Sequence, residues 1–97
     1  MRDYRKKMAK YRISRERYVQ LRNLCMDPQK RELVEAALKA MGDSGLSKYI
    51  LLHVTTKQWE WRHLEAAGIP CSADTFRIYR AKFYWFLDSM AGNGAKI

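Results

Sequence analysis

Apolar residues recur three or four positions apart along most of this chain, and β-branched residues nowhere alternate with polar ones over the length of a strand. This spacing places Tyr18, Leu21 and Cys25 on one face of a helix, with Leu24 beside them. Only two prolines and five glycines interrupt the pattern. The sequence therefore predicts an all-α fold, a single small bundle of about five helices.

Polar caps mark the boundaries of the first two helices. Ser14 can accept a hydrogen bond from the first turn of a helix over 15–26. Asp27 and Pro28 place a capping side chain before a proline at the first helical position, so the second helix is expected to begin at once. Gly42 is expected to end it, because glycine readily adopts the left-handed conformation that closes many helices.

The third helix, 45–54, is apolar on nearly every side and is expected to lie at the centre of the bundle. Asp43 or Ser44 can cap its start. Thr55 and Gln58 have the spacing of a capping box, which predicts that another helix begins there.

That fourth helix is expected to span 57–67 and to end at Gly68. A turn of four residues, 68–71, then leads to Ser72, which can cap a last helix over 73–90. Two helices joined by a short turn with a glycine form the shape of a helix-turn-helix, in which the second helix enters the DNA major groove. The sequence therefore predicts a helix-turn-helix-like hairpin at the C-terminal end.

The length of 97 residues predicts a single domain. Its expected parts are a basic arm or frayed helix over 1–13, helical support over 14–56, the helix-turn-helix-like unit over 57–90 and a flexible tail over 91–97.

Positive charge dominates the chain and is unevenly spread. There are 19 Lys and Arg residues against 10 Asp and Glu, a formal net charge of +9. Residues 1–30 carry a net +7, residues 31–68 are neutral and residues 69–97 carry +2. Like charges at this density repel one another and cost stability, so a polyanionic partner is expected. Double-stranded DNA is the leading candidate; anionic lipid and a merely solvated basic face are the alternatives.

The predicted last helix has two different faces when it is laid out at about 100° per residue. An aromatic and apolar face, expected to be buried, carries Phe76, Tyr79, Phe83, Phe86, Leu87 and Met90. The opposite face carries Asp74, Arg77, Ala81 and Asp88 and, further round, Ile78, Tyr84 and Trp85. This second face is expected to be open to solvent and free to meet a duplex.

Twelve residues are candidate DNA contacts. At the start of the last helix, base edges, phosphates or a thymine methyl group can be contacted by Ser72, Thr75, Arg77 and Ile78. The apolar stripe of the same helix is flanked by Arg80 and Lys82. The preceding helix would brace the duplex through Lys57 and Arg62. The N-terminal segment would hold backbone phosphates through Lys6, Lys7, Lys10 and Arg12.

Two other partners fit parts of the sequence. The basic N-terminal segment could rest on anionic lipid, but its narrow apolar face carries tyrosines, which argues against a membrane. The chain could instead be a protein-interaction or assembly adaptor that uses Tyr84 and Trp85 to bind a phage or host protein, or a second copy of itself as a homodimer. These two rings could also pack against the N-terminal helix of their own chain.

No motif for catalysis, a metal or a cofactor is found in the sequence. His53 and His63 lie on different predicted helices without a paired carboxylate motif, and the glycines form no phosphate-binding loop. Cys71 precedes a helix N-terminus, a place that can lower a thiol pKa, but a small residue packed in the turn is the simpler interpretation. Cys25 is expected in the core. We therefore expect no enzymatic activity and no cofactor.

Targeting signals are also missing from the sequence. No apolar run approaches the ~20 residues that span a bilayer, and the N-terminal segment lacks the apolar region of a signal peptide. The two cysteines are far apart and form no C-x-x-C pair. A cytoplasmic protein is expected.

Several stretches resemble small proteins encoded in phages and prophages of Gram-positive bacteria: KYRIS (10–14), ERY (16–18), YILLHVT (49–55), IPC (69–71) and TFRIYRAKFYWFL (75–87). The C-terminal half resembles the helix-turn-helix of sigma-factor-type and phage late-gene regulators. The resemblance implies DNA binding in transcription control, within the bacterial cytoplasm and at the nucleoid. This chain departs from the compact motif because residues 69–71 lengthen the turn before Ser72.

Overall fold

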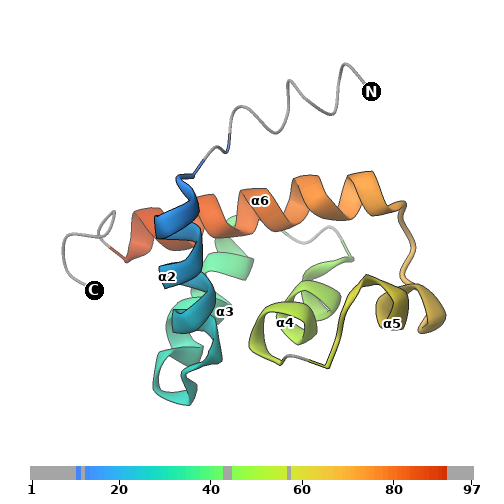
Figure 1. Ribbon diagram of the computed structural model, residues 1–97, viewed down its shortest axis with the longest axis horizontal. Helices are drawn as coiled ribbons and strands as arrows, with labels where there is room; N and C mark the ends of the chain where they lie inside the picture. Colours follow the sequence, from blue (N-terminus) through green and yellow to red (C-terminus); the bar gives the residue numbers. More distant parts are fainter. Residues whose placement is uncertain (1–10, 12, 43–44, 57, 92–97) are drawn as a thin grey trace.

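The computed structural model describes residues 11, 13–42, 45–56 and 58–91, and within these ranges the regular structure is entirely helical. The elements are α2 (Arg15–Met26), the short 3-10 helix η1 (Pro28–Lys30), α3 (Arg31–Ala40), α4 (Ser47–Thr55), α5 (Trp61–Ala66) and α6 (Ala73–Met90) (Figure 1). The predicted all-α small bundle is confirmed.

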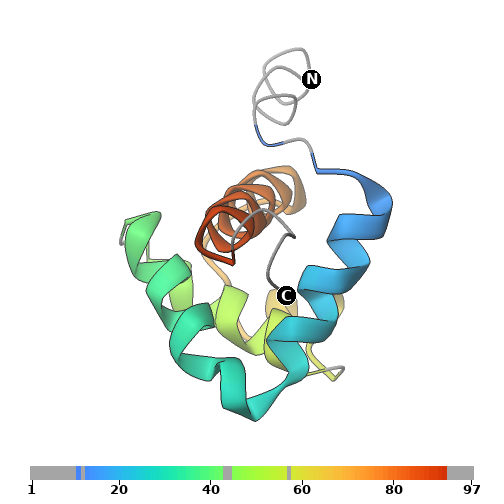
Figure 2. The ribbon, with the colours of Figure 1, turned by 90° about the vertical axis from the view of Figure 1, so that its left-hand side faces the viewer.

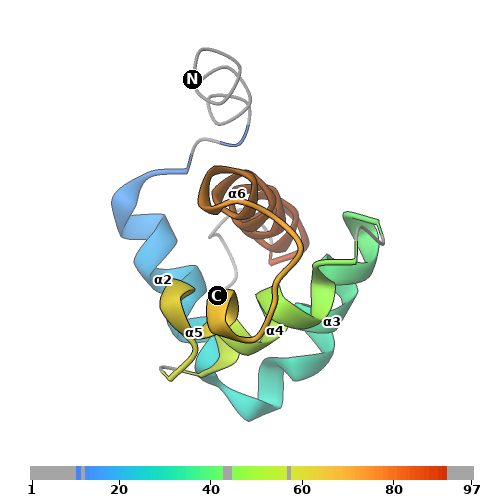
Figure 3. The ribbon, with the colours of Figure 1, turned by 90° about the vertical axis from the view of Figure 1, so that its right-hand side faces the viewer.

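The long helix α6 lies across the other helices. Viewed along its length, α6 has α2 on one side and α3 on the other, with α4 and α5 beneath it (Figure 2 and Figure 3). Its remaining side is not covered by any other described helix. Although α6 has 18 residues, no helix in the described ranges combines the length and apolar character that crossing a membrane requires.

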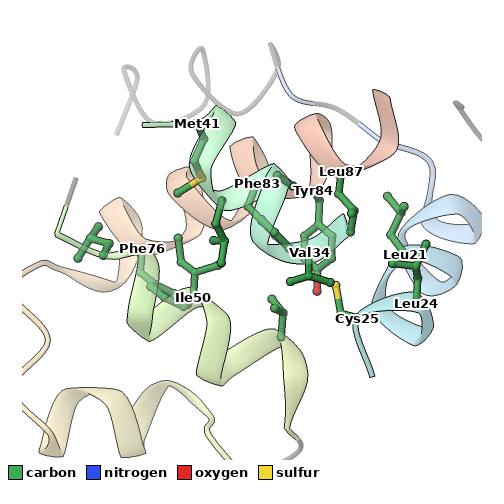
Figure 4. Packing of buried hydrophobic residues seen from close by; sticks show 14 of the residues in the cluster. Leu21, Leu24, Cys25, Val34, Met41, Ile50, Phe76, Phe83, Tyr84 and Leu87 are labelled. Carbon is green, nitrogen blue, oxygen red and sulfur yellow. The ribbon is translucent and has the colours of Figure 1, made fainter. Parts of the chain in front are cut away.

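The core lies beneath α6 and receives buried side chains from each of the five α-helices (Figure 4). α6 contributes Phe76 and Phe83, which are 2% and 0% exposed. Leu21 of α2, Val34 of α3 and Ile50 of α4 are fully buried against them. Burial of a side chain of this size contributes roughly 1.5–3 kcal/mol, so this cluster fixes how the helices pack.

The third helix, expected at the centre of the bundle, is fully buried on one face only, through Ile50 and Val54. Leu51, Leu52 and His53 are half-buried. α4 lies beneath α6, so its other face is only partly covered (Figure 2 and Figure 3).

The caps predicted for the first and last helices are present. Ser14 Oγ accepts a hydrogen bond from the Arg17 amide at 3.2 Å, and Ser72 Oγ accepts one from the Thr75 amide at 3.2 Å. Gly68 follows α5 with a φ of +86°, the left-handed conformation predicted for it.

The second helix begins later than predicted. Pro28 starts the 3-10 helix η1, and α3 begins three residues further on at Arg31. The predicted cap is nevertheless made, because Asp27 Oδ1 accepts a hydrogen bond from the Gln29 amide at 2.9 Å.

The capping box predicted at Thr55 and Gln58 is wrong. Thr55 is the last residue of α4, and its hydroxyl donates a hydrogen bond to the Leu51 carbonyl oxygen at 2.6 Å. The Thr56 hydroxyl donates in the same way to the Leu52 carbonyl oxygen at 2.9 Å. Both threonines therefore end α4 instead of beginning the next helix.

The helix predicted over 57–67 is consequently only six residues long. α5 begins at Trp61. The amide of the preceding residue, Glu60, donates a hydrogen bond to His63 Nδ1 at 3.2 Å. Six residues, 67–72, connect α5 to α6, one more than the five, 68–72, between the predicted helices. The hairpin therefore departs from the three- to four-residue turn of a helix-turn-helix.

Some predictions concern residues outside the described ranges. They are the alternative caps Asp43 and Ser44, most of the basic arm over 1–13 and the tail beyond residue 91. The residue before the first turn of α4 is Leu46, which makes no capping hydrogen bond through its side chain.

Candidate nucleic-acid interface

The uncovered side of α6 carries four residues at four-residue spacing, Arg77, Ala81, Trp85 and Ser89, which we call the outward stripe. Residues four apart follow one another along the same side of a helix. Arg77, Trp85 and Ser89 are exposed, and Ala81 is half-buried. A large ligand can therefore reach this line of side chains.

The polar residues predicted to read bases at the start of α6 are engaged in capping it. Ser72 Oγ donates a hydrogen bond to Thr75 Oγ1 at 3.1 Å, in addition to accepting one from the Thr75 amide. Ser72 is exposed, whereas Thr75 and Ile78 are half-buried. A nucleic acid that contacts these hydroxyl groups would have to share them with the helix cap.

Arg77 is accessible but has an acidic neighbour. Its Nη1 atom lies 3.5 Å from Asp74 Oδ1, and the two side chains are 53% and 47% exposed. Ion pairs this exposed contribute between about 0 and 1 kcal/mol. A phosphate group can therefore replace Asp74 as the partner of Arg77 at little cost.

Arg80, predicted to flank the apolar stripe of α6, is directed toward α4. Arg80 follows the buried Phe76 by four residues, so it lies on the same side of α6. Its Nη1 atom points to α4, where it is 3.1 Å from His53 Nε2. Arg80 is half-buried and cannot reach a ligand on the outward stripe while this contact is kept.

The protonation of His53 follows from its second contact. Its Nδ1 atom is 2.8 Å from the Trp59 carbonyl oxygen, which can only accept. Nδ1 therefore carries the proton, and Nε2 is left to accept from Arg80. Burial lowers the pKa of His53; the bond to Trp59 opposes this shift, and the charges of Arg80 and Arg22 add to it. The imidazole is thus held in its neutral form.

Tyr84 packs against the N-terminal helix of its own chain, one of the two alternatives given for it. It is only 3% exposed, and its ring meets Tyr18 of α2 edge-on with the ring centroids 4.9 Å apart. Eight residues separate Tyr84 from Phe76, so it continues the buried row. Of the two rings proposed for an adaptor surface, only Trp85, 41% exposed, stays accessible.

Trp85 joins the outward stripe to the N-terminal part of the chain. Tyr11 meets Trp85 edge-on, with 6.0 Å between the ring centroids and 70° between the ring planes. In the sequence Tyr11 stands between Lys10 and Arg12, in the most basic stretch of the chain. At Tyr11, four residues before α2 begins, the chain therefore lies against α6.

One ion pair removes two charges from the predicted surface. Arg17 Nε donates to Asp88 Oδ1, and the side chains are only 11% and 22% exposed. Arg17 Nη1 also donates to Gln20 Oε1 at 2.9 Å, while Nη2 is buried without a hydrogen-bond partner in the described chain. The sequence places Arg17 in the basic N-terminal stretch of the chain and predicts Asp88 on the outer face of α6. Nothing local in the sequence connects two residues 71 positions apart.

Most described cations have no carboxylate partner. Arg62, 79% exposed, lies 3.7 Å from Glu60 in the third ion pair. Within the described ranges no ion pair is formed by Arg15, Arg22, Lys30, Arg31, Lys39, Lys48, Arg80 or Lys82. The remaining predicted contacts, Lys6, Lys7, Lys10, Arg12 and Lys57, lie outside the described residues. Most of the cations that the structure describes are therefore not neutralised by a neighbouring carboxylate.

Neither thiol has the features of a nucleophile. Burial raises the pKa of Cys25 to about 12 and also raises that of Cys71. The position of Cys71 before α6 therefore does not activate it. The described residues contain no group of three or more side chains suited to holding a metal ion.

A comparison of the chain with protein-family models, curated proteins and solved structures found no match. The functional argument consequently depends on the residues and contacts given above.

Proposed function

We propose that this protein binds double-stranded DNA, chiefly through its phosphates, with the outward stripe of α6 and the basic N-terminal stretch facing the same duplex. The contact between Tyr11 and Trp85 carries the proposal, because it joins these two parts of the chain. The attraction comes from the net charge of +9 and from cations that, in the described ranges, mostly lack a carboxylate partner.

Phosphate contacts are favoured over base contacts by the composition of the outward stripe. Arg77 is its only cation, and Arg80 is turned toward His53. Ser72 and Thr75 could contribute secondary contacts from the start of α6. Because phosphate contacts carry little sequence information, binding should be strong at low salt and only weakly selective for sequence.

The biological role we propose is transcription control in a phage or prophage, within the bacterial cytoplasm. It is supported by the resemblance of residues 49–55 and 75–87 to such proteins. The net positive charge of the chain is in keeping with this role.

The proposal is tested by removing equal charge from two places on the molecule. The double variant Lys6→Gln/Lys10→Gln should weaken binding of a random duplex about tenfold at ~50 mM salt, because phosphate contacts are lost. The matched control, Lys30→Gln/Arg31→Gln, removes two charges where η1 meets α3, at the end of the molecule away from α6 (Figure 2). The control should weaken binding less than about threefold. Fluorescence anisotropy measures both, and equal losses would contradict the proposed surface.

An adaptor function is the second candidate, since Trp85 is a large exposed ring on the outward stripe. If the surface joins two copies of the chain, the wild-type protein should sediment as a dimer and the Trp85→Ala variant as a monomer. A wild-type monomer at high concentration would contradict self-association.

A further inference from the structure

A pocket of about 200 Å³ opens between α2, α4, α6 and the loop before α5. Its wall includes Tyr18 and Arg22 from α2, His53 from α4, Trp59 from the loop, and Arg80 and Tyr84 from α6. At about 30 Å³ for each water molecule, it has room for six or seven waters, enough for a small oxyanion. The segments that surround the pocket can be followed in Figure 1.

Two guanidinium groups give the pocket a positive character. Arg22 and Arg80 both line it, and neither forms an ion pair within the described ranges. Glu60 is the one carboxylate among the lining residues. Its side chain is 65% exposed and lies 3.7 Å from Arg62, so much of its charge is directed to solvent. Guanidinium groups match the geometry of oxyanions with fixed, paired donors.

Tyr84 adds an uncharged donor to the pocket. The residue is 3% exposed and lines the pocket. Its hydroxyl is not among the fully buried unpartnered atoms of the described chain, where Arg17 Nη2 stands alone, so it is open to the pocket and available to a ligand. Burial raises the pKa of Tyr84, so the hydroxyl keeps its proton and can donate it in a hydrogen bond. An oxygen atom of a bound anion would complete this site.

His53 acts as a positioning residue for the site. Its Nδ1 proton is held by the Trp59 carbonyl oxygen, so its Nε2 atom accepts from Arg80 at 3.1 Å. This contact orients the Arg80 side chain toward the pocket and away from the outward stripe.

We propose that this pocket binds a phosphoryl group, held by the guanidinium groups of Arg22 and Arg80 and by the Tyr84 hydroxyl. A phosphoryl group offers three or more oxygens to these donors, whereas a carboxylate offers only two. The group can come from free phosphate or a small phosphate monoester, or from the 5′-phosphate at a nucleic-acid end. The proposal stands independently of duplex binding by the outward stripe.

The central test is an NMR titration of the full chain with inorganic phosphate, against sodium chloride at equal ionic strength. Tyr84→Phe removes only the hydroxyl, so it should fold normally and raise the Kd for phosphate about three- to tenfold. Arg22→Gln and Arg80→Gln should each raise the Kd about tenfold or more. Arg31→Gln, an exposed arginine that does not line the pocket, is the matched control and should leave the Kd unchanged.

Two results would overturn the proposal. One is a response to phosphate no larger than the response to chloride. The other is a Kd that Tyr84→Phe and Arg22→Gln leave unchanged, which would place the bound anion elsewhere.

The source of the phosphoryl group is identified by competition in the same titration. A short duplex with a 5′-phosphate should displace inorganic phosphate from the pocket if a DNA end is the natural ligand, while the same duplex with a 5′-hydroxyl should not. If methyl phosphate displaces it and neither duplex does, the pocket serves a small phosphate ligand. Either result supports the proposal.

Discussion

Arg17 and Asp88 illustrate how two charged residues on predicted surface positions become part of the structure. Their side chains are 11% and 22% exposed, and Arg17 Nη2 already lacks a partner in the described chain. Asp88→Asn leaves this buried guanidinium without its counter-charge. We expect a loss of about 3 kcal/mol in the free energy of unfolding, measured by urea denaturation.

The control for this prediction is Asp74→Asn. Its partner Arg77 is 53% exposed, and solvent can replace the carboxylate. The free energy of unfolding should therefore change by less than about 1 kcal/mol. Equal losses in the two variants would show that the burial of the pair has no energetic consequence.

His53 should make the stability of the protein depend on pH. Burial lowers its pKa in the folded chain below the ordinary value of 6.5. As the pH falls below 6.5, the unfolded chain takes up a proton before the folded chain does, so the free energy of unfolding should decrease. Above 6.5 the contribution of His53 is fully present.

His53→Gln removes this titration and should flatten the pH dependence below about pH 6.5, although it also lowers the stability by disturbing the Arg80 contact. Urea denaturation at several pH values measures both effects. The same slope in the variant and the wild type would show that His53 is not the group responsible.

The side chains of α6 show what can be predicted about single residues. The angle of each residue around the helix axis, taken as 100° per residue, correctly predicts that Phe76, Phe83 and Leu87 lie in the core and Arg77 at the surface. It misplaces Met90, which is 41% exposed, and leaves open whether Tyr84 packs within its own chain, because the width of the buried sector depends on which helices pack on each side. That width is set by α2 and α4, which no periodicity within α6 reveals.

At the scale of elements, substitutions of Gly68 measure how much the left-handed backbone conformation of this residue contributes to the connection between α5 and α6. Its φ is +86°, and a Cβ atom built there would have no neighbour within 4 Å. Gly68→Ala should therefore cost about 1–2 kcal/mol through backbone strain alone. Gly68→Asn should cost less, because asparagine tolerates this conformation better. Thermal unfolding measures the difference, and an equal cost for both would point to a steric cause instead.

Helix boundaries were predictable where one signal was present and unpredictable where two competed. Ser14 and Ser72 each stand alone before a helix, and both cap it. Thr55 satisfies the pattern of a helix start, but its hydroxyl can equally bond the carbonyl one turn earlier. His53 also bonds the Trp59 carbonyl oxygen and so holds the loop that follows α4. In this arrangement the Thr55 hydroxyl bonds the carbonyl one turn earlier, and Thr55 ends α4.

On the scale of the whole molecule, the position of α6 across the other helices could not be read from the sequence. Helix lengths and apolar faces indicate that a bundle forms, but not which helix lies across the others. The pocket between α2, α4 and α6 was missed for the same reason. Arg22, His53 and Arg80 come from three helices, and no sequence motif connects them.

The central claim, that the basic surface binds duplex DNA through phosphates, is tested most directly by the salt dependence of binding to a random duplex. Each neutralised phosphate adds about −0.9 to the slope of log K against log salt, so four contacts predict a slope near −4 and a steep loss of affinity between ~50 and ~200 mM salt. A slope near zero, or a Kd weaker than about 1 mM even at low salt, would contradict the claim.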